Sequence, residues 1–178
     1  MAVIQKIRDF FSHERAEDQK SQETNFLGGE YEIKPATVDF LDEIHRANQI
    51  CFKRGESYSR KIFQYLLSSP KVLGYCAFTC DSKIVAFIFA TLEDDGTGHI
   101  STIGVLPEHR KRGLARSLIL HVEKMLVKKG VITVRLEVRV SNLPAQNLYE
   151  KLGYRTVQRL PNYYNDGEDG FLMVKSLV

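Results

Sequence analysis

From residue 31 onward, the apolar positions alternate between the spacing of strands and that of helices. The runs 72–79 and 84–92 are rich in β-branched and aromatic residues, and the turn-forming segment 80–83 lies between them. This arrangement predicts a β-hairpin. The same kind of pattern predicts further strands at 31–34, 99–105, 131–140, 154–160 and 171–176.

Apolar residues at helical spacing fill the intervals between these strands. One helix is expected from Thr37, its predicted N-cap, to about residue 47, and a second ends before Pro70. A long amphipathic helix follows residue 113, and the last helix begins after Asn142 and ends before Gly153. A strand–helix–strand unit, with a hairpin before it and more strands after it, implies an α/β fold with a mixed central sheet flanked by helices.

The first 30 residues differ from the rest of the chain. Ile4, Ile7 and Phe10 recur at helical spacing, and a polar stretch and a Gly-Gly pair follow them. We therefore expect residues 1–30 to form an N-terminal extension, a short amphipathic helix plus a linker, and residues 31–178 to form the main domain. The pattern leaves open whether the extension docks on its own domain, binds a partner or frays.

Composition excludes several classes of protein. The chain has 178 residues, of which 43% are hydrophobic and 26% charged, and this is ordinary for a globular protein. A net charge of +3 does not by itself imply a nucleic-acid partner, and no apolar run is long enough for a membrane span. Only Cys51, Cys76 and Cys80 are present, so a reducing, cytoplasmic location is expected. Cys76 lies in the predicted strand 72–79 and Cys80 directly follows it, at a spacing that puts both on one strand face. This placement favours core packing over a metal pair.

The clearest candidate for chemistry is the basic loop 107–116, which joins a strand to a helix. Backbone N–H groups at the start of a helix can bind an anion, and Gly113 and Ala115 leave room for a phosphate to approach. Arg110, Lys111, Arg112 and Arg116 add positive charge, so a diphosphate is a suitable ligand. On local features alone, a solvated basic loop remains open.

Three ordered motifs resemble a known family. Arg110-x-x-Gly113-x-Ala115 after a strand looks like the acetyl-CoA pyrophosphate signature of the GCN5-related N-acetyltransferase (GNAT) superfamily. The segments 136–142 (LEVRVSN) and 148–154 (LYEKLGY) look like those of the RimI and archaeal Ard-type protein N-terminal (Nα) acetyltransferases. Asn162-Tyr163-Tyr164 with 166–169 (DGED) resembles their closing hairpin. The likeness spans about residues 31–178.

The resemblance implies a GNAT fold in which two parallel central strands, here 99–105 and 131–140, splay apart around the pantetheine arm of acetyl-CoA. Backbone groups of residues 103–105 would pair with that arm, and the loop 110–115 would hold the pyrophosphate. The residues expected at the cosubstrate are Ile103, Gly104, Val105, Arg110, Lys111, Arg112, Gly113, Leu114, Ala115, Asn142, Tyr149, Glu150 and Lys151.

The resemblance also implies roles in catalysis. Glu137 would be the general base, His99 would share that role or hold a water, and Tyr149 would be the acid for the departing thiolate. Glu137 could otherwise be one charge on a solvated strand face, and Tyr149 a helix-packing aromatic. His99 and Glu137 could also hold zinc, although two ligands are too few to predict a metal site.

Peptide recognition is expected from two loops that flank the splayed strands. Glu56, Tyr58 and Tyr164 are the expected substrate contacts, and Glu56 would favour neutral or basic residues near the acceptor amine. The leading prediction is a protein N-terminal acetyltransferase that transfers acetyl directly within a ternary complex. Acetylation of a protein lysine or a small amine, an acyl-CoA-binding module and a nucleic-acid binder are the alternatives.

Overall fold

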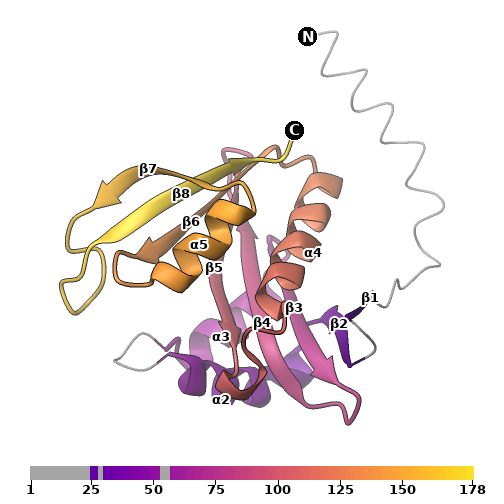
Figure 1. Ribbon diagram of the computed structural model, residues 1–178. Helices are drawn as coiled ribbons and strands as arrows, with labels where there is room; N and C mark the ends of the chain where they lie inside the picture. Colours follow the sequence, from indigo (N-terminus) through magenta and orange to yellow (C-terminus); the bar gives the residue numbers. More distant parts are fainter. Residues whose placement is uncertain (1–24, 28–29, 53–56) are drawn as a thin grey trace, which may run out of the picture.

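The computed structural model describes residues 25–27, 30–52 and 57–178, and a mixed β-sheet runs through the middle of this part of the chain (Figure 1). The strands lie in the order β1-β2-β3-β4-β5-β6-β8-β7. Within this sheet only β5 and β6 pair in parallel, and the other neighbours pair antiparallel. The strands are β1 (Asn25–Leu27), β2 (Tyr31–Pro35), β3 (Val72–Thr79), β4 (Ile84–Leu92), β5 (Gly98–Val105), β6 (Thr133–Arg139), β7 (Arg155–Leu160) and β8 (Gly170–Ser176).

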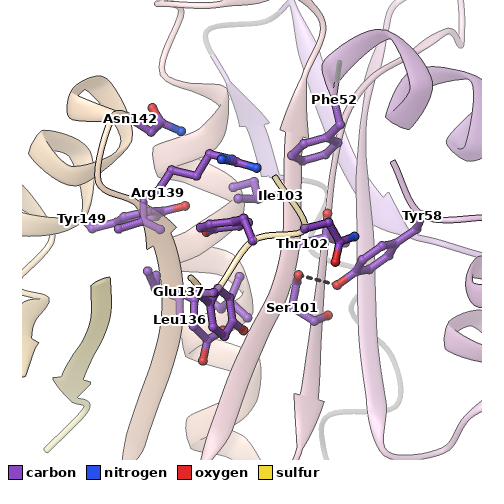
Figure 2. Close-up of a pocket in the computed structure, with 15 residues that line it drawn as sticks. Phe52, Tyr58, Ser101, Thr102, Ile103, Leu136, Glu137, Arg139, Asn142 and Tyr149 are labelled. Atoms are coloured by element: carbon purple, nitrogen blue, oxygen red, sulfur yellow. Dashed lines mark hydrogen bonds between the residues drawn. The ribbon is translucent and has the colours of Figure 1, made fainter. Parts of the chain in front are cut away.

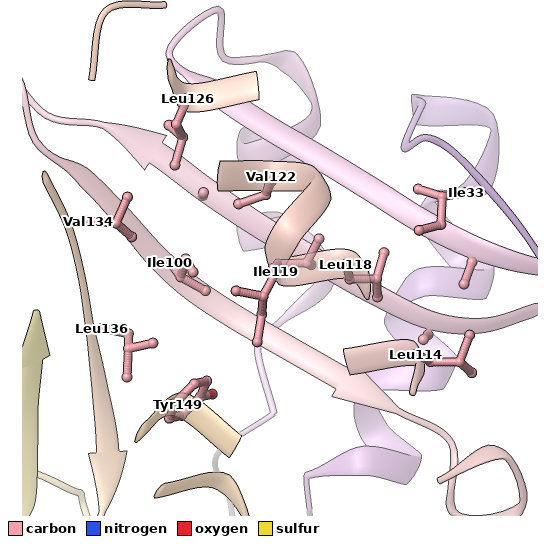
Figure 3. Packing of buried hydrophobic residues seen from close by; sticks show 14 of the residues in the cluster. Ile33, Ile100, Leu114, Leu118, Ile119, Val122, Leu126, Val134, Leu136 and Tyr149 are labelled. Carbon is pink, nitrogen blue, oxygen red and sulfur yellow. The ribbon is translucent and has the colours of Figure 1, made fainter. Parts of the chain in front are cut away.

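Helices cover both faces of the sheet. On one face, α2 (Leu41–Cys51) and α3 (Arg60–Ser68) bury apolar side chains against Phe87 and Phe89 of β4. On the other face, α4 (Leu114–Lys128) places Leu118, Ile119, Val122 and Leu126 over the strands, and α5 (Leu143–Lys151) continues this layer (Figure 3). Two 3-10 turns, η2 (Val38–Phe40) and η3 (Pro107–His109), lead into α2 and toward α4.

The predicted α/β fold and most predicted elements are confirmed. The hairpin of β3 and β4 has the bounds that the sequence pattern gave. The Asn142 side chain accepts a hydrogen bond from the Ala145 N–H at 3.2 Å, so it caps α5 as predicted. Thr37 stands before η2, but its side chain makes no capping hydrogen bond. Its hydroxyl donates to Asp39 instead, at 3.5 Å.

One prediction about the cysteines is wrong. Cys76 is buried in β3, as expected, but Cys80 is exposed because β3 ends at Thr79 and the chain has already entered the turn. The helix predicted within residues 4–11 lies outside the described residues, and the proposed boundary at residue 30 stays a prediction. In the described structure, no helix is long and apolar enough to cross a bilayer.

The two parallel strands at the centre separate soon after they meet. β5 and β6 are paired only at Gly98 with Val134 and at His99 with Arg135. Just beyond this point β5 carries a bulge, since Ala90 of β4 pairs with Ile100 while Phe89 pairs with Thr102. A bulge adds one residue to a strand and bends it. The extra residue, Ser101, therefore lies where β5 turns away from β6, and the predicted splay is present.

Candidate active site

A cavity of about 380 Å³ lies between the diverging strands (Figure 2). Its walls come from β5, from β6, from α5 and its N-cap, from the α2–α3 connection and from the loop between β7 and β8. The segments of chain that meet here are far apart in sequence, as the splayed fold predicts. The lining residues are Phe52, Tyr58, Ile100, Ser101, Thr102, Ile103, Leu136, Glu137, Val138, Arg139, Asn142, Tyr149, Tyr163, Tyr164 and Asn165.

Glu137 lines the cavity, and it is hydrogen-bonded to His99, which does not line the cavity itself. The distance from His99 Nε2 to Glu137 Oε2 is 2.7 Å, and Arg135 Nη1 donates to Glu137 Oε1 at 2.8 Å. The Glu137 side chain is only 10% exposed, so it is not one charge on a solvated strand face. Burial alone would raise the pKa of the Glu137 carboxyl, but the hydrogen bonds and charges of His99 and Arg135 outweigh burial and lower that pKa. Glu137 is therefore a carboxylate at neutral pH.

Tyr149 enters the same cavity from α5. Its side chain is buried, and its ring packs edge-on against Tyr154 with 5.8 Å between ring centroids. Burial raises the pKa of the Tyr149 phenol to about 12, so the hydroxyl keeps its proton at neutral pH and can donate it. The packing role and the chemical role are compatible at this position.

Three tyrosines line the cavity. The predicted Tyr58 and Tyr164 both lie there, whereas Glu56 lies outside the described residues. Tyr163, which the sequence analysis did not single out, also lines the cavity, and burial raises its pKa, with a smaller contribution from Glu137. The doubled tyrosine in the closing motif was a signal that both rings could face the site.

Arg139 fixes the loop that carries Tyr163 and Tyr164. Arg139 Nη1 donates to both carboxylate oxygens of Asp166 at 3.1 Å and also to Glu168. The guanidinium lies over the Tyr164 ring, 4.0 Å from its centroid. Glu168 in turn accepts from the Ser141 N–H at 2.8 Å. The closing loop is thus tied to the end of β6, two residues beyond Glu137.

The predicted phosphate loop has the backbone geometry that an anion site needs. Gly113 is the N-cap of α4 with φ at +83°, and no side chain caps the helix there. A Cβ at Gly113 would meet nothing within 4 Å, so the approach to the helix start is open. Leu114 is buried in the core, and only its backbone can face a ligand. The first amides of the helix are therefore available to a phosphate.

The cationic side chains of this loop do not all point to one place. Arg112 Nη1 donates to the Tyr31 hydroxyl at 3.0 Å and lies 3.7 Å from Glu30, so its guanidinium is held against β2. Arg110 Nε donates to the Val105 carbonyl at 3.0 Å. Lys111 and Arg112 are exposed, and the loop offers fewer converging charges than its sequence predicts.

The other predicted cosubstrate residues divide into two groups. Ile103, Asn142 and Tyr149 line the cavity. Gly104 faces the opposite layer, where a Cβ would come 2.6 Å from the Phe87 ring and 3.1 Å from Cys51 Sγ, so only glycine fits. Val105 continues β5 toward the phosphate loop, and the side chains of Glu150 and Lys151 are exposed at the end of α5. Within the described residues, no three His, Cys, Asp or Glu side chains are placed so that they could hold a metal ion together.

The profile of the family described as "Acetyltransferase (GNAT) family" matches residues 38–154. The chain belongs to this family. The acetyltransferase is 38% identical over 151 residues to the "N-terminal acetyltransferase A complex catalytic subunit NAA10" of Arabidopsis thaliana, covering 82% of the chain and 77% of that relative. It is 30% identical over 164 residues to the "N-alpha-acetyltransferase" of Saccharolobus solfataricus, covering 84% of the chain and 95% of that relative.

A solved structure agrees with this assignment. The acetyltransferase superimposes on the ribosomal-protein-S18-alanine N-acetyltransferase from Escherichia coli with a TM-score of 0.74 and 29% identity, covering 83% of this chain and 94% of that one. The predicted family, fold class and enzyme class are therefore confirmed, and acetyl-CoA is the acyl donor. The predicted action on protein N-termini agrees with the names of these relatives. The individual roles of the site residues stay predictions.

Proposed function

We propose that this acetyltransferase transfers the acetyl group of acetyl-CoA directly to the α-amino group of protein N-termini. The observation that supports this most is the placement of Glu137, which is hydrogen-bonded to His99, and of Tyr149 on the walls of one cavity between β5 and β6. A thioester and an amine held together in this space react without a covalent enzyme intermediate, because binding supplies proximity and orientation.

The α-amino group must lose a proton before it can attack. Its ordinary pKa is about 7.7–8.0, against about 10.4 for a lysine side chain, so only mild base assistance is required at neutral pH. Glu137 is ionised and hydrogen-bonded to His99, and a histidine can take up and release a proton near neutral pH. We assign the base role to this pair, acting on the amine directly or through one water.

The departing thiolate needs a hydrogen-bond or proton donor. Tyr149 is the candidate because its phenol is buried in the cavity wall and stays protonated. A proton moves from the Tyr149 hydroxyl to the sulfur as the carbon–sulfur bond breaks. The amine releases one proton to solvent, and solvent returns one proton to Tyr149. The acid and the base are thus separate groups on separate elements.

The chain's backbone is suited to hold acetyl-CoA. The edge of β5 that faces the splay has no strand partner beyond His99 among the described strands. The Ser101 and Val105 carbonyls already accept from Tyr58 and Arg110, and the remaining backbone groups of this edge can pair with an extended ligand. The open helix start at Gly113 would hold the two phosphates. Side chains of Asn142 and Tyr149 would lie along the other side of the pantetheine arm.

The acceptor side of the cavity favours a peptide. Tyr58, Tyr163 and Tyr164 present aromatic surface and hydroxyls along its border, and this combination suits an extended backbone better than a small polyamine. We therefore propose that the partners are nascent or mature protein N-termini. No disulfide joins the three described cysteines, and we propose a cytoplasmic location.

A peptide panel tests the proposal. Peptides with a free N-terminus and an internal lysine are incubated with the full chain and acetyl-CoA, and fragment mass spectra locate the acetyl group. We expect modification of the α-nitrogen only, with no product from peptides whose N-terminus is already blocked. Acetylation of lysine in blocked peptides, or no coenzyme A release with any peptide, would contradict the proposed function.

A further inference from the structure

Glu93 is a carboxylate beside the candidate base pair that the sequence pattern did not indicate. It follows the last residue of β4 and begins the turn that leads into β5. The Glu93 N–H donates to the Thr97 carbonyl at 2.9 Å, and the Gly96 N–H donates to the Glu93 carbonyl at 3.1 Å. These bonds fix the Glu93 backbone next to the start of β5, where His99 stands.

Four ionisable side chains close a ring at this point. Glu93 Oε1 lies 3.6 Å from His99 Nδ1, and His99 Nε2 lies 2.7 Å from Glu137 Oε2. Arg135 completes the ring, with Nη1 at 2.8 Å from Glu137 Oε1 and Nη2 at 3.9 Å from Glu93 Oε1. Acidic and basic groups alternate around the ring, and each nitrogen of the His99 ring faces a carboxylate.

The solvent exposure of the side chains increases from Glu137 through His99 to Glu93. The Glu137 side chain is 10% exposed and lines the cavity, His99 is 20% exposed, and Glu93 is 35% exposed. Glu93 does not line the cavity, so it cannot contact the reacting amine. The only route from Glu137 to Glu93 within the ring that carries a transferable proton passes through the imidazole, since an arginine does not deprotonate in proteins.

We propose that Glu93 is a positioning residue for His99 and the outlet for the proton that the amine releases. This inference rests on the proposed function and deepens the same site. Glu137 takes one proton from the ammonium group and passes it to His99 Nε2, so a neutral ring that carries its proton on Nδ1 becomes an imidazolium. The Nδ1 proton then passes toward Glu93 and on to bulk water, which leaves a neutral ring protonated on Nε2. Exchange of this ring proton with solvent returns it to Nδ1, so each cycle delivers one proton to solvent and leaves the amine neutral.

The charges around His99 determine what removal of Glu93 would do. The His99 ring faces Glu93 from the β4–β5 turn and Glu137 from β6, while Arg135 balances both carboxylates. Tyr58 and Tyr163 interact with Glu137 from the far side of the cavity. Without the Glu93 carboxylate, the pair is less well held and gives up protons more slowly.

The test is Glu93→Gln in the full chain, with Asp94→Asn as the matched control. Asp94 is the next residue, and its carboxylate is 91% exposed and paired with Lys71, away from the ring. We expect Glu93→Gln to lower kcat for an N-terminal peptide about tenfold, with little change in KM for the peptide or acetyl-CoA. Asp94→Asn should leave kcat and both KM values unchanged.

A Glu93→Gln enzyme with wild-type kcat would overturn the proposal. An equal loss in both variants would also overturn it, since that would reflect general surface charge. Glu93→Asp should restore part of kcat, because it returns the carboxylate. If the wild-type chain itself acetylates no peptide, the proposed function fails. If the wild-type chain is active and Glu93→Gln has the same kcat, only the inference about Glu93 fails.

Discussion

The Tyr58 hydroxyl donates a hydrogen bond to the backbone carbonyl of Ser101 at 2.9 Å. Ser101 is the extra residue of the β5 bulge, so a side chain from the α2–α3 connection holds the strand at the point where it leaves β6. The Asn48 side-chain amide donates to the Tyr58 carbonyl at 3.2 Å, and this bond ties the α2–α3 connection to α2. Tyr58 is thus part of the wall that shapes the cavity, in addition to its predicted place at the acceptor.

Tyr58→Phe should therefore damage the acceptor site more than the fold. Loss of one hydrogen bond is expected to lower the free energy of unfolding by about 1 kcal/mol. We expect kcat/KM for the peptide to fall about tenfold, equivalent to about 1.4 kcal/mol, while KM for acetyl-CoA hardly changes. Tyr65→Phe on the exposed face of α3 is the control. Steady-state kinetics of both variants measure this effect. Similar losses of kcat/KM in the two variants would argue against a role for the Tyr58 hydrogen bond.

Gly113 and Gly96 offer a matched pair for the phosphate site. Both have φ at +83°, and at both a Cβ would meet nothing within 4 Å. Alanine at either position should cost a similar conformational strain of about 1–2 kcal/mol. Only Gly113 begins the helix assigned to the phosphates, so Gly113→Ala alone should raise KM for acetyl-CoA, by about fivefold or more. Equal KM values for acetyl-CoA in the two variants would contradict the assignment of the phosphate site to the start of α4.

Tyr149→Phe tests the acid role. The substitution keeps the ring that packs against Tyr154 and removes only the hydroxyl. We expect turnover to fall about 100-fold, the scale of general acid catalysis, while equilibrium binding of acetyl-CoA is little affected. Calorimetric binding and turnover measured on the same preparation separate the two effects. Unchanged turnover would reject the acid role and leave Tyr149 as a packing residue.

Much of the scaffold was predictable because its signals are local. The β3–β4 hairpin follows from two β-rich runs around a turn, and the α5 boundaries follow from Asn142 and Gly153. The Glu137–His99 contact was expected only from the resemblance, and the structure brings the two side chains together. That pairing joins residues 38 positions apart, which no periodicity in the chain can show.

The parts that were missed depend on distant contacts. The Ser101 bulge exists only in the register between β4 and β5. Arg112 was expected at the phosphates, but its partner Tyr31 is 81 residues away in sequence. Glu93 looked like one more acidic residue in a turn until the fold placed it beside His99. In each case the deciding interaction is tertiary.

The lowered pKa of Glu137 makes an acid-stability prediction. The carboxyl has its ordinary value of 4.5 in the unfolded chain and a lower one in the folded protein. Its contribution to stability is therefore complete above about pH 4.5 and is lost as the pH falls through the folded value. The stability difference between wild type and Glu137→Gln should shrink from about pH 7 to about pH 3. Urea unfolding across this range measures it, and a constant difference would contradict the assignment.

The most direct test of the central claim is the pH dependence of peptide acetylation by Glu137→Gln at saturating acetyl-CoA. If the Glu137–His99 pair deprotonates the amine, the variant should be about 100-fold slower than wild type near pH 6.5. The deficit should shrink toward about pH 9.5, where an amine of pKa about 8 has already lost its proton. A deficit that stays the same at every pH, or a variant as fast as wild type at low pH, would contradict the account.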